Sequence, residues 1–68
     1  MSPEQIPGTN MWALSEGEYV EGEGGKVVGP AVVRVEEFET NEGILSLVQS
    51  GEQKIQLLGC FPDVVKKR

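Results

Sequence analysis

The chain has 68 residues, a net charge of −5, one cysteine and no histidine. A domain of this size buries only ~60% of the surface that its unfolded chain exposes, and this composition excludes an internal disulfide and a typical zinc site as compensation. We therefore expect one domain that gains stability from self-association or from docking on a larger partner.

The first part of the chain predicts little regular structure. Residues 1–10 hold two prolines and a glycine around one apolar anchor, Ile6, and indicate an extended arm. The apolar run at residues 11–14 predicts a short strand, or a plug that lays Trp12 over the open end of a sheet. Residues 18–20 predict another short strand, and the glycines at residues 22–25 a flexible connection.

Alternating apolar and polar residues between positions 26 and 58 predict a three-stranded antiparallel meander. Its strands cover residues 31–38, 44–49 and 53–58. Turns are expected at residues 40–43 and 50–51, where glycine and asparagine tolerate a positive φ. Pro30 cannot donate to a strand ladder, so it belongs at an edge, a bulge or a corner between two strands.

The phase of the alternation predicts one buried face. Its members are Val33, Val35, Leu45, Leu47, Ile55 and Leu57. Truncating Leu47 to alanine is then expected to cost ~2–5 kcal/mol. Phe38 falls out of phase, which predicts a bulge near residues 36–37 or cover on both faces at that end. The strand 44–49 is apolar on both sides, so a central position is expected, and Ile44 and Val48 on its second face need another layer.

The predicted fold class is all-β, a small antiparallel barrel or sandwich of about five strands built on the meander. The predicted organisation is an arm at residues 1–10, a single β domain at residues 11–65 and a basic tail at residues 66–68.

No residue pattern predicts catalysis, a cofactor or a metal site. The glycine-rich residues 22–26 lack the following Ser or Thr and the helix of a phosphate-binding loop. Cys60 has no histidine to activate it, which favours a buried structural role. Closely spaced glutamates such as Glu16 and Glu18 are typical of a solvated surface. We therefore expect that the chain is not an enzyme.

The function that remains is a non-catalytic protein-interaction or assembly module, either a homo-oligomer or a small subunit of a larger complex. The predicted interface combines the end of the arm with the second face of the central strand: Met11, Trp12, Ile44 and Val48. No apolar stretch reaches the ~20 residues that span a bilayer, and the first residues lack a leader pattern. We therefore expect a cytoplasmic protein without a membrane partner.

Two alternatives stay open. An acidic surface formed by Glu36, Glu37, Glu39 and Glu42 suggests an inhibitor or nucleic-acid mimic that occupies a basic groove. A nucleic-acid-binding small barrel would instead use Arg34, Lys54 and the basic tail. Nucleic-acid binding is disfavoured because the chain has only six lysines and arginines, three of them at its end.

Overall fold

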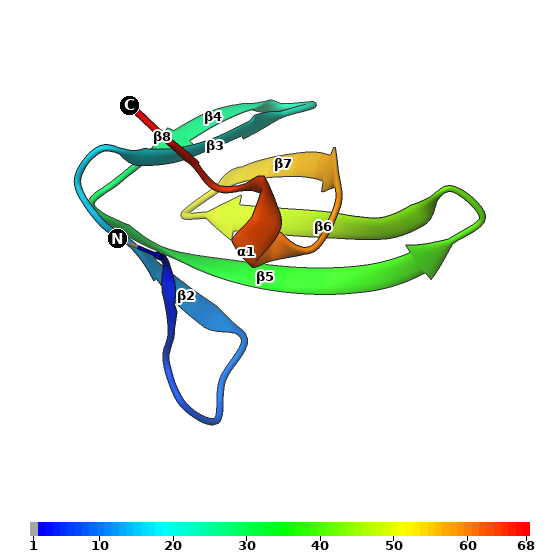
Figure 1. The fold of residues 1–68 in the computed structure, drawn as a ribbon, viewed down its shortest axis with the longest axis horizontal. Helices are drawn as coiled ribbons and strands as arrows, with labels where there is room; N and C mark the ends of the chain where they lie inside the picture. Colours follow the sequence, from blue (N-terminus) through cyan, green and yellow to red (C-terminus); the bar gives the residue numbers. More distant parts are fainter. Residues whose placement is uncertain (1) are drawn as a thin grey trace.

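The computed structural model describes residues 2–68, which form two antiparallel sheets that face each other across the core (Figure 1). The elements are β1 (Glu4–Gln5), β2 (Met11–Leu14), β3 (Glu18–Gly22), β4 (Gly25–Val28), β5 (Ala31–Thr40), β6 (Gly43–Ser50), β7 (Gln53–Leu58), α1 (Phe61–Val64) and β8 (Lys66–Lys67). The five-stranded sheet has the order β1-β2-β5-β6-β7, and the three-stranded sheet has the order β4-β3-β8.

The predicted meander is confirmed as strands β5, β6 and β7, with β6 in the interior of the larger sheet. The turn between β5 and β6 ends at Gly43, whose φ of 120° is open to glycine but strained for other residues. Thr40 reinforces the same turn, because its hydroxyl donates to the Gly43 carbonyl and accepts the Glu42 N–H.

The predicted buried face is wrong for β6. Val35 of β5 pairs with Val48, which in turn pairs with Ile55 of β7, and all three are buried. Leu45 and Leu47 therefore point to the opposite face of the sheet, and both are half-buried. The error has a physical reason: β6 is apolar in both phases, so its periodicity alone does not say which side faces the core.

The expected irregularity around Phe38 is absent from the described strands. Pairing between β5 and β6 runs without interruption from Arg34 to Thr40, so no bulge resets the phase. Phe38 lies on the same face as Arg34 and Glu36, and its side chain is 48% exposed. The out-of-phase aromatic is thus a surface residue of a regular strand.

The core lies between the two sheets and draws on both of them. Phe61, from the short helix α1, closes one side of it and is fully buried, with the Trp12 ring centroid 5.2 Å away. The buried apolar residues are Leu14, Val20, Val27, Val33, Val35, Val48, Ile55 and Phe61.

The chain passes from the smaller sheet to the larger one at Gly29-Pro30, between β4 and β5, which agrees with the corner expected at Pro30. At the other end of the smaller sheet, Glu23 and Gln56 exchange two backbone hydrogen bonds that tie the β3–β4 hairpin to β7. Gly22 permits this close approach, because a Cβ there would overlap the Gln56 carbonyl oxygen. The sheets nevertheless do not close into a barrel.

Both ends of the described chain are paired. Residues 4–5 of the predicted arm form β1, which is the edge strand beside β2, with Gln5 opposite Trp12. The predicted basic tail forms β8, in which Lys66 pairs with Tyr19 and Lys67 with Glu18 of β3. The confirmed part of the predicted fold class is a small antiparallel all-β protein.

Candidate functional site

The outer face of the five-stranded sheet, which points away from the core, is arranged in three cross-strand rows over β5, β6 and β7. Side chains directly opposite each other on paired strands share a face and contact one another. The rows, in order along β5, are Arg34–Gln49–Lys54, Glu36–Leu47–Gln56 and Phe38–Leu45–Leu58. This face therefore changes from basic to apolar along the strands.

The third row, which we name the apolar row, is the most exposed apolar feature of this face. Phe38 is 48% exposed and Leu58 is 56% exposed, with the half-buried Leu45 between them. Beside Leu45 and Leu58, a hollow of about 310 Å³ opens near Glu23, Glu42 and Gln56. Contiguous exposed apolar side chains with a polar rim are typical of a protein interaction site.

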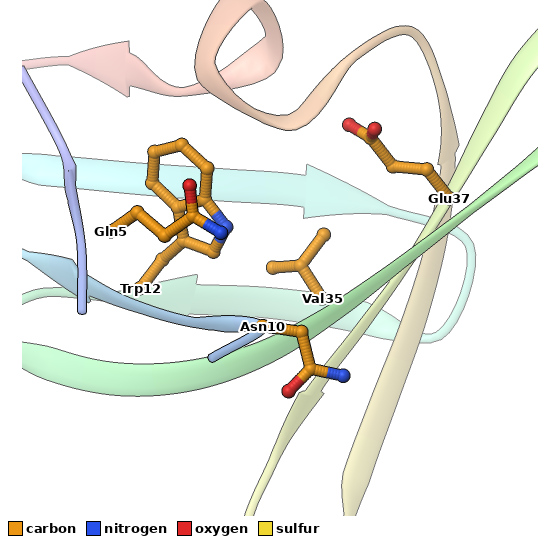
Figure 2. Close-up of a pocket in the computed structure, with 5 residues that line it drawn as sticks. All are labelled: Gln5, Asn10, Trp12, Val35 and Glu37. Carbon is orange, nitrogen blue, oxygen red and sulfur yellow. The ribbon is translucent and has the colours of Figure 1, made fainter. Parts of the chain in front are cut away.

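A second hollow, which we name the tryptophan pocket, lies on the inner side of the same sheet. Its volume is about 280 Å³, and its walls are Gln5, Asn10, Trp12, Val35 and Glu37. Figure 2 shows Trp12 and Val35 lining the hollow, with the Glu37 carboxylate at one side of it and Gln5 beside the indole. The pocket thus combines an aromatic ring, a carboxylate and the Gln5 side-chain amide.

Two hydrogen bonds hold the polar walls of the tryptophan pocket. One carboxylate oxygen of Glu37, Oε2, accepts the backbone N–H of Phe61 at 3.0 Å. The Gln5 amide donates from Nε2 to the Thr9 carbonyl at 2.8 Å. The Asn10 side chain points away from the other four residues (Figure 2), and its Oδ1 accepts a bond of 3.1 Å from Arg34 Nη1 on the outer face. Among residues 2–68, no donor is bonded to Glu37 Oε1 or Gln5 Oε1, so both oxygens keep their accepting capacity.

The four residues of the predicted interface do not gather into one surface. Trp12 is half-buried against Phe61 of its own chain, and Val48 is fully buried in the core. Ile44 lies on the inner face opposite Glu39, whereas Met11 lies on the outer face opposite Arg34. Val48 therefore offers no surface to a partner in this conformation, whereas the apolar row, which the sequence did not single out, is exposed.

The predicted acidic surface maps to the β5–β6 hairpin, which projects beyond the other strands in Figure 1. Alternation along β5 divides it, because Glu37 and Glu39 lie on the inner face while Glu36 lies on the outer face. Glu42 lies in the turn. Within residues 2–68, none of these four carboxylates forms an ion pair, so their charges stay available to a partner.

The sequence-based prediction for Glu18 was wrong. Glu18 was expected on a solvated surface, but it is 1% exposed. Its Oε1 accepts the Ser15 N–H at 2.6 Å and so holds the turn between β2 and β3, while Oε2 has no hydrogen-bond partner. The neighbouring Glu16 is exposed, and nothing in the local pattern distinguishes the two residues.

The remaining candidates lie apart. Cys60 is exposed rather than buried. In the described part of the chain, no three Cys, Asp or Glu side chains lie close enough to hold a metal ion. Arg34 and Lys54 flank Gln49 on the outer face, whereas the basic tail belongs to the other sheet. Between residues 2 and 68 there is no helix with the length and apolar character needed to cross a membrane.

In comparisons with known proteins, no family model, curated protein or solved structure matches the chain significantly.

Proposed function

We propose that the chain is a non-catalytic protein-interaction or assembly module, and that copies of it associate through the outer face of the five-stranded sheet. The single observation that supports this most is the apolar row, in which Phe38, Leu45 and Leu58 lie directly opposite one another and remain accessible. Burying such a row against a partner removes apolar surface from water, which is the main favourable term in association.

The charge distribution supports a second copy as the partner. The chain carries a net charge of −5, so two copies repel each other on average. The three rows of the outer face instead hold Arg34 and Lys54 against a single carboxylate, Glu36. Contact through this face keeps most glutamates of the two copies apart, and a Debye length of ~8 Å at physiological salt weakens the rest of the repulsion.

The small size of the chain favours the same proposal. The core consists of eight buried apolar residues, and no disulfide adds to it. A second layer over the outer face would complete a sandwich of sheets. Docking on a larger complex would supply that layer equally well. The unpaired, exposed Cys60 thiol fits the reducing cytoplasm as the setting.

The test is the native mass of the full chain by light scattering, for the parent and two variants. Phe38→Thr shortens the apolar row while keeping a residue that favours strands. Val28→Thr is the matched control, since Val28 is 42% exposed but lies on β4 of the smaller sheet. We expect a parent particle well above the 7.4 kDa chain mass, a smaller one for Phe38→Thr and no change for Val28→Thr. A parent that remains monomeric at high micromolar concentration would contradict self-association.

The acidic inhibitor is the second candidate, and the unpaired carboxylates of the β5–β6 hairpin favour it. A mimic of a phosphate backbone needs a regular row of carboxylates on one surface. Here only Glu37 and Glu39 share a face of β5, and Glu36 points the other way. The hairpin thus supplies charge without the regular spacing, which ranks this candidate below assembly.

A nucleic-acid-binding role has weaker support. Arg34 and Lys54 share one row of the outer face, but the tail residues Lys66 and Lys67 pair within the other sheet. Few phosphates can then be neutralised together, and affinity for duplex DNA rises with that number. We expect negligible DNA binding at physiological salt in a fluorescence titration. Sub-micromolar binding with a steep salt dependence would reverse this ranking.

A further inference from the structure

We propose that the tryptophan pocket binds the cationic end of an arginine or lysine side chain presented by a basic segment of a partner protein. This inference is independent of self-association, because the pocket lies on the inner side of the five-stranded sheet and the apolar row on the outer side. Its walls are Gln5, Asn10, Trp12, Val35 and Glu37.

The chemistry of the walls selects a cation. No lysine or arginine lines the pocket, and its one charged wall is the Glu37 carboxylate. Glu37 Oε1 and Gln5 Oε1 are acceptors, and a guanidinium or ammonium group carries only donors. The Trp12 ring adds a face that attracts cations, since indole is the best of the aromatic side chains in this interaction. An anion would meet the carboxylate and is disfavoured.

The pocket is organised before any ligand arrives. Phe61 fixes the Glu37 carboxylate through its backbone N–H and also packs beside Trp12, with their ring centroids 5.2 Å apart. The bond from Gln5 Nε2 to the Thr9 carbonyl holds the amide at the pocket wall. Groups that are already ordered lose less conformational entropy on binding, so weak contacts give more net affinity.

Size and surroundings fit a single side chain on a peptide. A volume of about 280 Å³ lies just below the ~300–1,000 Å³ range of pockets for drug-sized molecules. The inner face of the β5–β6 hairpin extends from the pocket and adds Glu39 two residues beyond Glu37. Arg34, the nearest cation in sequence, lies on the outer face, where Asn10 accepts its hydrogen bond. Basic residues that flank the inserted side chain therefore meet negative charge.

The binding test uses the chain's only tryptophan, because Trp12 lines this pocket and its fluorescence responds to a bound side chain there. The probes are pentapeptides of glycine with two arginines, two lysines or two citrullines, all capped at both ends. Citrulline keeps the shape of arginine without its charge. We expect the arginine and lysine peptides to change the fluorescence in a saturable way that weakens with added salt. Equal binding of the citrulline peptide, or no response to any peptide at millimolar concentration, would overturn the proposal.

Variants of two neighbouring glutamates distinguish binding in the pocket from non-specific attraction to an acidic protein. Glu37→Gln removes the charge but keeps an oxygen for the Phe61 N–H, and we expect about fivefold weaker binding of the arginine peptide. Glu36→Gln makes the same change in net charge on the opposite face of β5, and we expect less than a twofold effect. Equal weakening by both variants would mean diffuse attraction and would refute the site. Circular dichroism melting curves show whether each variant is folded.

Gln5→Ala tests the second acceptor of the pocket. Gln5 is exposed on the two-residue edge strand β1 opposite Trp12, and circular dichroism melting shows whether this variant is folded. We expect it to weaken binding of the arginine peptide about twofold through the loss of one acceptor, about 0.4 kcal/mol at ~1.4 kcal/mol per factor of ten. Unchanged affinity in both Gln5→Ala and Glu37→Gln would overturn the proposal, because neither acceptor would then contact the cation.

Discussion

On β6 a polar side chain of the inner face is more buried than the leucines of the outer face. The inner face holds Ser46, which is fully buried, and the outer face holds Leu45 and Leu47, which keep part of their surface in water. A leucine gains more than a serine from burial, so a strand considered alone would be expected to turn its leucines inward. In this fold the pairing of β6 with its neighbours decides the orientation instead.

Register explains the reversal. Val48 must face the core if it is to pair with Val35 and Ile55, which are buried on the two flanking strands. The two-residue period then carries Ser46 inward and both leucines outward. The buried hydroxyl is satisfied, because Ser46 Oγ donates to the Gly59 carbonyl at 2.6 Å. The outer leucines therefore lie outside the core of the single chain and keep part of their surface in water.

The largest expected contrast between the faces lies on β7. Ile55 has no exposed surface, and Leu58, three residues later, is 56% exposed on the other face. We expect Ile55→Ala to lower the free energy of unfolding by ~2–5 kcal/mol, because it leaves a cavity in the core. Leu58→Ala is the matched control, with a cost below ~1 kcal/mol. Urea unfolding of both variants at a concentration where the chain is monomeric checks this, and equal losses would contradict the assigned faces.

Ser46 offers an intermediate effect. Ser46→Ala removes the donor to the Gly59 carbonyl in a buried setting, and we expect a loss of ~1–3 kcal/mol in unfolding free energy. Ser50→Ala is the control, since Ser50 is only half-buried at the end of the same strand. A Ser46→Ala variant as stable as the parent in urea would mean that the inner position of β6 does not depend on this bond.

The smallest effect is expected at Leu47, where the sequence alone predicted a core leucine. Because Leu47 is half-buried between Glu36 and Gln56 on the outer face, we now expect Leu47→Ala to cost about 1 kcal/mol in the monomer. A loss as large as that of Ile55→Ala in the same urea experiment would mean that Leu47 faces the core, as the sequence alone predicted, and would contradict the structure.

The sequence identified the meander because its signals are local. Gly43 and Gly51 mark the turns, and the alternation between them fixes strand positions without reference to distant residues. The sequence could not show which side chains of β6 face the core, because this depends on contacts with β5 and β7 and not on the pattern of β6 itself. Phe38 was the one local signal of the exposed apolar face, because an aromatic residue out of phase on a regular strand lies on the side away from the core.

The sites were harder to predict than the strands. Trp12 was singled out as a residue of interest, but the pocket around it needs Gln5, Val35 and Glu37 from two other strands. Glu37 was grouped with its acidic neighbours, and only the fold shows that its carboxylate accepts the Phe61 N–H. Glu18 has the sequence surroundings of a surface glutamate, so no local signal could have shown that it is buried.

A dilution series followed by methyl NMR spectra tests directly whether copies meet through the outer face of the five-stranded sheet. We predict that the methyl signals of Leu45 and Leu58 shift together with concentration, because both lie in the apolar row. The signals of Val28, exposed on the smaller sheet, and of the buried Ile55 should stay constant. Leucine signals that do not move between micromolar and millimolar concentration, or shifts centred on Val28, would contradict the account.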